Sequence, residues 1–332
     1  MRRPMLRPMR FFITGATGFV GGHLVEHLTR AGHDVRGMAR SEAGAAAVRA
    51  FGGTPVTADL DTISVAALDG VDVIVHAAAQ LTGLDRAAYL RVNVDGTRRL
   101  LDLARAAGVR RFVLIGTEAA LFAGHDLVDI DETHPYPARP RYLYAETKAL
   151  AEQLVLAADG PDLTALSVRP RLVWGPRDTS VAPAIAEMAA RGRFRWIDGG
   201  RQATSTTHVR NLARAVELAA ERGQGGRAYF VADDERSTMR AFLTRLLAAR
   251  GVTLPDRSAP GAVLRPLARA VEGLWRLLRR RSAPPLSSFA IDMLSRSVTV
   301  RTDRARAELG WAPVISVEEG LRELTSAAKG AI

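Results

Sequence analysis

The chain has 332 residues, which is enough for a large α/β domain and a second, interleaved region. It contains no cysteine, which excludes disulfides, thiolate metal sites and cysteine nucleophiles and suits a reducing cytoplasm. The net charge of +11 comes mainly from scattered arginines, and no recognised nucleic-acid-binding module accompanies it, so we expect no nucleic-acid partner.

Residues 1–9 are rich in arginine, methionine and proline, and we expect a flexible leader there. The apolar run that follows, Phe11–Ile13, is too short for an export signal. No run approaches the roughly 20 apolar residues of a membrane span. We therefore expect a cytoplasmic protein.

Short apolar segments alternate with helical patterns over residues 10–170. The predicted strands include Phe11–Ile13, Asp34–Ala39, Val71–Val75, Arg111–Ile115 and Leu163–Val168, and the predicted helices include Phe19–Ala31 and Asn93–Ala107. This order predicts an α/β, Rossmann-type domain with a doubly wound parallel sheet and right-handed crossovers. Ligands of such sheets bind at the carboxyl ends of the strands.

The pattern becomes irregular after residue 170, and prolines break the later part into loops. We interpret residues 171–330 as a smaller substrate-binding region, with the segment around 205–232 returning to the Rossmann domain. Residues 182–283 are rich in leucine, alanine and valine, which favours a lipophilic small-molecule ligand.

A glycine loop lies between the first strand and the first helix. Gly15, Gly18 and Gly21 have the spacing that lets a backbone turn tightly and approach a pyrophosphate at a helix N-terminus. Such triplets also occur by chance, but this one stands between a strand and an amphipathic helix. We expect Thr17, Phe19 and Val20 to contact the same dinucleotide.

Strand two ends in Ala39, where an acidic residue would hold the adenosine ribose of NAD. Arg36 and Arg40 lie close by, and a cation there would attract the 2′-phosphate of NADP. We therefore expect NADP(H), although both arginines are also explained as surface residues and NAD(H) stays open. Further cofactor contacts are expected at strand ends, from Asp59 and Leu60 beside the adenine and from Ala77, Ala78 and Ala79.

Tyr144 and Lys148 stand four residues apart on a predicted helix. They share a helix face, so we expect the ammonium to favour the ionised phenol and provide a proton donor near neutral pH. Tyr142 is less suitable because the residue four positions later is Glu146. The pair indicates hydride chemistry.

The histidines His23, His27 and His33 are expected on the first helix's surface and in the turn after it, and we predict no metal site. The segment 264–281 is amphipathic and leaves two interpretations open. It is either a helix that rests on a membrane surface or a lid that packs its apolar stripe on the protein, which we favour. The stripe consists of Leu267, Val271, Leu274, Trp275 and Leu278.

Over nearly its whole length the chain resembles the extended short-chain dehydrogenase/reductases. Within them it is similar to the 3β-hydroxysteroid dehydrogenase and sterol-4α-carboxylate 3-dehydrogenase group and to the bacterial 2-alkyl-3-oxoalkanoate reductases. The motifs that carry the resemblance are Thr14–Gly21, Asn93–Thr97, Tyr144–Glu152 and Arg169–Asp178. It implies reversible hydride transfer between a nicotinamide and a 3-oxo or 3-hydroxy group of a lipophilic substrate.

The resemblance also implies residue roles. Tyr144 transfers the proton, Lys148 lowers the tyrosine pKa and holds the nicotinamide ribose, Thr117 bonds the reacting oxygen, and Asn93 completes the proton path. Pro170 and Val173 are expected beside the cofactor. Gly116 and Glu118 depart from the family pattern, which has further hydroxyl residues next to Thr117.

Three further expectations follow. A homodimer is plausible, with Leu100, Leu103, Leu150 and Leu154 at its interface, although these leucines would equally suit the core. One alternative function is a nucleotide-sugar epimerase or dehydratase. Another is a non-catalytic sensor that binds a dinucleotide.

Overall fold

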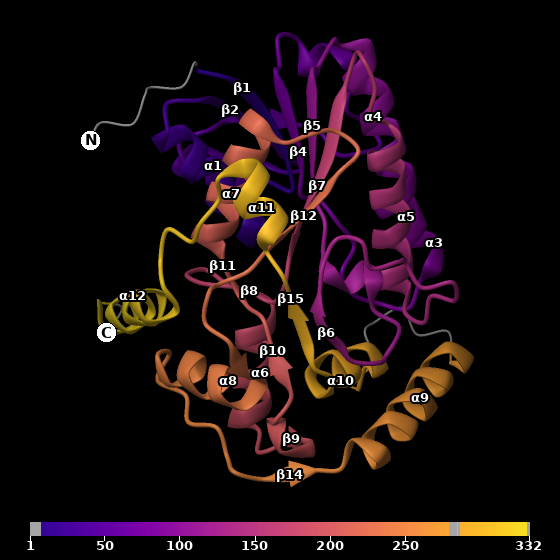
Figure 1. Cartoon of the computed structure of the whole chain (residues 1–332), viewed down its shortest axis with the longest axis vertical. Coiled ribbons are helices and arrows are strands. Elements are labelled where there is room, and N and C mark those ends of the chain that lie inside the picture. Colours follow the sequence, from indigo (N-terminus) through magenta and orange to yellow (C-terminus); the bar gives the residue numbers. More distant parts are fainter. Residues whose placement is uncertain (1–7, 279–283, 285, 331–332) are drawn as a thin grey trace.

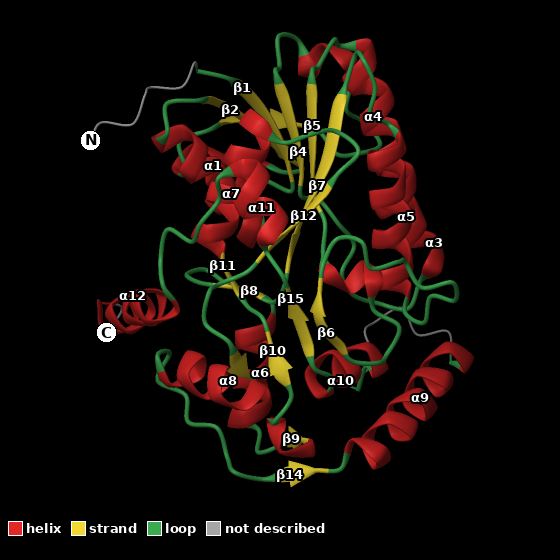
Figure 2. Cartoon of the chain, viewed as in Figure 1, coloured by secondary structure: helices red, strands yellow, loops and turns green. Residues whose placement is uncertain are grey.

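The computed structural model describes residues 8–278, 284 and 286–330. Its centre is a seven-stranded parallel sheet in the order β12-β7-β5-β4-β1-β2-β3 (Figure 2). The strands are β1 (Arg10–Thr14), β2 (Asp34–Ala39), β3 (Thr54–Thr57), β4 (Val73–His76), β5 (Arg111–Ile115), β7 (Thr164–Pro170) and β12 (Ala228–Val231). The predicted doubly wound sheet is thereby confirmed.

Helices cover both faces of this sheet (Figure 1). One face carries α1 (Phe19–Arg30), α2 (Glu42–Ala50), α7 (Val209–Arg222) and α11 (Asp303–Leu309), and the other carries α4 (Gly96–Ala106) and α5 (Leu143–Ala157). Central strands therefore contact apolar residues on both sides, and all three apolar residues of β1, Phe11, Phe12 and Ile13, are fully buried.

The second region is built around a four-stranded sheet in the order β13-β10-β15-β6. Its strands are β13 (Ser237–Thr238), β10 (Ala203–Thr204), β15 (Val298–Val300) and β6 (Leu127–Ile130), and two short pairs join β8 (Val173–Trp174) to β11 (Thr207–His208) and β9 (Trp196–Ile197) to β14 (Ser258–Ala259). Its helices are α6 (Val181–Ala190), α8 (Met239–Ala248), α9 (Gly261–Leu277), α10 (Ser288–Ser295) and α12 (Val317–Gly330). An aromatic core containing Trp174, Phe194, Trp196 and Phe242 holds α6 and α8 together.

Among the residues that the structure describes, five shorter helices lie in the connections between these elements. They are η1 (Val65–Leu68), α3 (Arg86–Tyr89), η2 (Leu90–Asp95), η3 (Glu118–Leu121) and η4 (Asp198–Gly200). The predicted helix over 93–107 therefore begins as a π-helical turn, η2, before continuing as α4. Because π-helical turns are frequent at functional sites, this irregularity lies where a site is expected.

Helix α9 does not pack its whole apolar stripe on the protein, as the favoured lid interpretation would require. Leu267, Leu274 and Leu278 are exposed, whereas Val271 and Trp275 are partly buried. The stripe covers one face of the helix, and only the edge of it that holds Val271 and Trp275 packs on the protein. Residues 279–281 of the predicted segment lie outside the described residues. Within the described part of the chain, no helix is long and apolar enough to cross a membrane.

Packing places several leucines, histidines and N-terminal residues differently from what we expected from the sequence. Leu100 is fully buried in the core between the sheet and α4, so it is unavailable to a dimer interface, while Leu150 is exposed. His23 and His33 are buried rather than on the surface, because α7 packs against α1. Of the leader expected over 1–9, residues 1–7 lie outside the described residues, and Met9 packs against the core.

Candidate active site

The predicted site residues come together at the carboxyl edge of the seven-stranded sheet. The glycine loop follows β1, Arg40 follows β2, Asp59 and Leu60 follow β3, Ala77–Ala79 follow β4, Thr117 follows β5, and Pro170 ends β7. Val173 lies in β8, three residues beyond Pro170. Parallel strands bring these separate segments to one edge because their carboxyl ends all point the same way.

The glycine loop is closely packed. Gly15 has φ +68°, and a Cβ atom on it would lie 2.8 Å from Ala78 N. A Cβ atom on Gly21 would collide with the main-chain oxygen of Gly15. Gly18 caps α1 without a side-chain hydrogen bond, so the first N–H groups of the helix have no side-chain acceptor at the cap. This arrangement fits a bound pyrophosphate.

A buried histidine, His76, fixes the end of β4 beside this loop. Its Nδ1 lies 2.7 Å from Thr14 Oγ1, and its Nε2 lies 3.0 Å from Thr97 Oγ1. Burial lowers the pKa of His76 to about 3, and the charge of Lys148 contributes. The ring is therefore neutral and structural, linking β1, β4 and α4. No local sequence spacing indicated this network.

The two arginines considered for a 2′-phosphate have different surroundings. Arg36 Nη1 donates to the main-chain oxygen of Asp69 at 3.0 Å. Arg40 is exposed, and its charge contributes to lowering the pKa of Asp59, after the hydrogen bonds from Thr62. Arg40 is therefore the better placed cation, while Arg36 stabilises a loop.

Tyr144 lies partly buried on the first turns of α5, and Phe289 of α10 packs against its ring at 5.7 Å between centroids. Burial raises the pKa of Tyr144, and the charge of Glu118 raises it further, while the neighbouring Thr117 hydroxyl opposes this. Lys148 is not among the groups that shift the pKa of Tyr144 in this structure, so the expected effect of its ammonium on the phenol stays a prediction. The charge that acts on Tyr144 here is that of a carboxylate.

Lys148 is buried one turn further along α5, and its Nζ donates to the main-chain oxygen of Ile115 at 2.7 Å. Burial lowers the pKa of Lys148 to about 8, partly offset by Glu152. The ammonium is thus held against the end of β5, close to Thr117 in sequence, and it retains its charge at neutral pH.

Asn93 occupies the π-helical turn η2 and is almost fully buried. Its Oδ1 accepts from Gln80 N at 2.7 Å, and its Nδ2 donates to Thr147 Oγ1 at 2.9 Å. Asn93 therefore ties the segment after β4 to helix α5 between Tyr144 and Lys148. This geometry gives it a positioning role.

An ion pair, Glu152–Arg169, lies beneath Lys148 and was not predicted from the sequence. The two groups approach to 2.7 Å and are almost completely buried. Ser167 Oγ also donates to Glu152, at 2.5 Å. A Cβ atom on Gly116 would lie 2.7 Å from Glu152 and would collide with Ser167. The departure at Gly116 therefore has a steric reason.

A second buried ion pair accounts for the departure at Glu118. Glu118 Oε1 lies 2.6 Å from Arg171 Nη1, and Thr117 Oγ1 donates to Glu118 Oε2 at 2.8 Å. The one signal in the sequence was an acid next to Thr117, where hydroxyl residues are typical. Its partner, 53 positions away, could not be identified without the fold.

Tyr142 is held in a structural contact. It is the N-cap residue of α5, and its hydroxyl donates to Asp292 Oδ2 at 2.5 Å. Asp292 also accepts from Arg265 Nε of α9 at 3.0 Å. Tyr142 thus joins α5 to α9 and α10, whereas Tyr144 remains beside Thr117.

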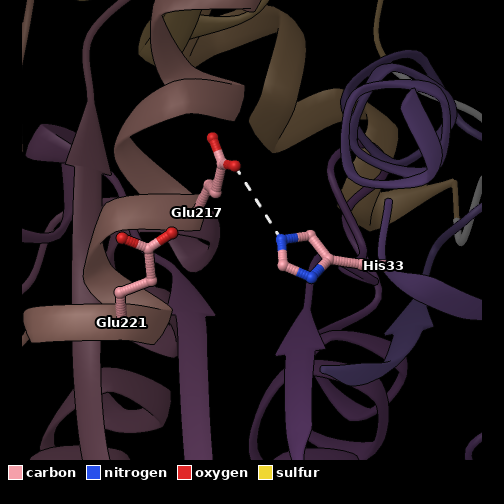
Figure 3. A group of neighbouring side chains, drawn as sticks. All are labelled: His33, Glu217 and Glu221. Carbon is pink, nitrogen blue, oxygen red and sulfur yellow. Dashed lines mark ion pairs between the residues drawn. The ribbon is translucent and has the colours of Figure 1, made fainter. Parts of the chain in front are cut away.

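A group of three potential metal ligands lies away from this edge (Figure 3). The ligand atoms of His33, Glu217 and Glu221 lie within 4.8 Å of one another. His33 Nδ1 accepts from Met9 N at 3.2 Å, so the proton of the neutral ring is on Nε2, which faces Glu217 at 3.8 Å. A protonated nitrogen is no metal ligand. We interpret the group as a polar contact between α7 and the turn after α1.

Comparison with known proteins gives consistent matches over the whole chain. The sequence profile of the NAD dependent epimerase/dehydratase family matches residues 11–232. The 4-hydroxy-2-methyl-3-oxo-4-farnesyl-3,4-dihydroquinoline-1-oxide ketoreductase of Stigmatella aurantiaca is 41% identical over 322 residues, covering 96% of each chain. The 2-alkyl-3-oxoalkanoate reductase of Stenotrophomonas maltophilia (strain K279a) is 35% identical, covering 96% of this chain and 99% of the relative.

Among solved structures, that of gox2253 superimposes with a TM-score of 0.78 at 28% identity. It covers 97% of this chain and 98% of its own.

Proposed function

The chain belongs to the NAD dependent epimerase/dehydratase family, and we propose that it is an NADPH-dependent reductase of a lipophilic ketone. The protein is an oxidoreductase like its ketoreductase and 3-hydroxysteroid dehydrogenase relatives. The observation that carries the proposal is the Tyr144 phenol beside Thr117, with the Lys148 ammonium bound at the end of β5.

The state of Tyr144 favours reduction. A ketone that accepts a hydride at its carbon must gain a proton at its oxygen, and the donor must hold that proton beforehand. Burial and Glu118 both raise the pKa of Tyr144, so its phenol is protonated at neutral pH. A nicotinamide in its reduced form supplies the hydride when bound. Thr117 lies beside the Tyr144 hydroxyl, next to the place of the reacting group.

Two further residues serve this geometry. Lys148 holds a positive charge at the end of β5, which stabilises negative charge that develops on the Tyr144 oxygen during proton transfer. Asn93 keeps η2 and α5 in register through Thr147. Both act on the position and charge of Tyr144.

The NADP(H) preference rests on Arg40. This guanidinium is exposed beyond β2, where Ala39 offers no carboxylate to repel a 2′-phosphate. Arg36 already donates a hydrogen bond to the main-chain oxygen of Asp69, so Arg40 is the cation that would contact the phosphate.

The substrate class rests on the relatives and on the surroundings of Tyr144. The Stigmatella aurantiaca relative is named for a substrate with a 3-oxo group, a 4-hydroxy group and a farnesyl chain. In this chain, Phe289 packs against Tyr144, and the Met293 sulfur lies 3.9 Å from Arg171 Nη1. These apolar groups of α10 suit a lipophilic ketone better than a nucleotide diphosphate.

The test combines cofactor titration with turnover. We expect NADPH to bind more tightly than NADH, and Arg40→Ala to remove the difference while Arg36→Ala, the matched control, keeps it. Tighter binding of NADH by the wild type would overturn the cofactor preference. Oxidation of NADPH on addition of a long-chain ketone would support reduction, whereas turnover of UDP-sugars without net cofactor oxidation would support an epimerase.

A further inference from the structure

The hydroxyl hydrogen of Thr117 already takes part in a hydrogen bond to Glu118. Thr117 Oγ1 lies 2.8 Å from Glu118 Oε2, and an ionised carboxylate only accepts hydrogen bonds, so the hydroxyl must be the donor. The same oxygen accepts from Ala119 N at 3.2 Å. A hydroxyl has one hydrogen and two lone pairs, so Thr117 retains a single lone pair, which lies beside the Tyr144 hydroxyl and becomes available when Tyr144 donates its hydrogen to a ketone.

Glu118 is held in place as an anion. Its other oxygen lies 2.6 Å from Arg171 Nη1, and both side chains are only 2–3% exposed. Arg171 Nη2 also donates to the main-chain oxygen of Met293 in α10 at 3.2 Å. Turning the Thr117 hydrogen towards a substrate would remove one of the bonds to a buried carboxylate, which is costly.

The consequence concerns the substrate. A ketone oxygen only accepts hydrogen bonds, so it gains the Tyr144 hydrogen but nothing from Thr117 in this state. A hydroxyl on the neighbouring carbon would donate to the free lone pair of Thr117. We propose that Glu118 makes Thr117 a hydrogen-bond acceptor and that the enzyme thereby selects ketones with a hydroxyl group on the adjacent carbon. This inference rests on the proposed reduction.

In this proposal Glu118 and Arg171 are positioning residues. They contact Thr117 and α10, and they act on the substrate through the direction of one hydrogen bond. A site arranged to accept a substrate hydroxyl discriminates against the analogue without it, because its acceptor is then left unpaired. One such bond corresponds to roughly tenfold in kcat/KM.

The experiment compares a long-chain α-hydroxy ketone with the same ketone lacking only the hydroxyl, using NADPH. We expect the wild type to prefer the hydroxy ketone about tenfold or more. Glu118→Leu combined with Arg171→Met removes both charges together and frees the Thr117 hydrogen, so the preference should disappear or invert. The matched control, Glu152→Leu with Arg169→Met, removes the other buried pair and should keep the preference.

A second pair of variants keeps the test decisive if the double variant does not fold. Thr117→Val removes the acceptor and should abolish the preference, whereas Thr117→Ser should retain it. Equal turnover of both ketones by the wild type would overturn the selection of hydroxy ketones and leave the reduction standing. Turnover of neither ketone would overturn the proposed reduction and this inference with it.

Discussion

The ammonium nitrogen of Lys148 lies 2.7 Å from the main-chain oxygen of Ile115, the last residue of β5. This bond joins α5 to the strand that leads into Thr117. Because the ammonium is buried, its pKa is lowered to about 8, so Lys148 titrates within the range of ordinary assays.

Tyr144→Phe removes the proton donor. We expect turnover to fall by about 10²–10⁴-fold, with binding of NADPH retained. Tyr142→Phe is the matched control, since it removes only the hydrogen bond to Asp292. It should cost about 1 kcal/mol of stability and leave turnover within a few-fold of the wild type. Equal losses in both variants, measured by steady-state kinetics, would contradict the assignment.

Lys148→Met should change stability in a pH-dependent way. The folded-state pKa is depressed from 10.5 to about 8, so between these pH values the folded protein holds fewer protons, and stability rises with pH. Below pH 8 the cost of the buried charge is fully present, about 3 kcal/mol. Thermal melting should show the variant to be more stable at pH 7, with the difference shrinking towards pH 10.5. A less stable variant at pH 7 would show that the bond to Ile115 outweighs burial.

Gly116→Ser introduces a hydroxyl of the kind that the family resemblance led us to expect beside Thr117, yet we expect it to destabilise the protein. Its Cβ would be forced against Glu152 and Ser167, and such overpacking costs typically about 1–3 kcal/mol. Gly160→Ser is the control, because a Cβ atom there meets nothing within 4 Å. Chemical denaturation should show a loss for Gly116→Ser and a change within about 0.5 kcal/mol for Gly160→Ser.

The exposed stripe of α9 suits the surface of a membrane. Leu277 is 78% exposed, and Leu267 and Leu274 lie on the same side of the helix. Replacing these three leucines by serine should reduce cosedimentation with vesicles that contain phosphatidylglycerol, because apolar contact drives interfacial binding. Serine at Leu81 and Val128, which are also exposed, should leave it unchanged. Unchanged vesicle binding of the α9 variant would contradict membrane contact.

Most strands of the seven-stranded sheet and its doubly wound parallel class could be predicted from the sequence, because strand and helix patterns are local. The spacing of Gly15, Gly18 and Gly21 and the four-residue separation of Tyr144 and Lys148 have direct geometric meaning within one turn or one helix. The carboxyl edge of a parallel sheet then accounts for the gathering of the other predicted residues.

The charges and hydrogen bonds of the site were decided by tertiary structure. Glu118 meets Arg171, and Lys148 meets Ile115, across separations of 53 and 33 residues, for which the sequence carries no local signal. The pKa of Tyr144 is raised by burial and by the charge of Glu118, neither of which the four-residue spacing of Tyr144 and Lys148 indicates. Likewise, periodicity identified α9 as amphipathic, but only packing decided which of its apolar residues face solvent. A pKa and a buried face depend on every group within a few ångströms, and folding brings those groups from distant parts of the chain.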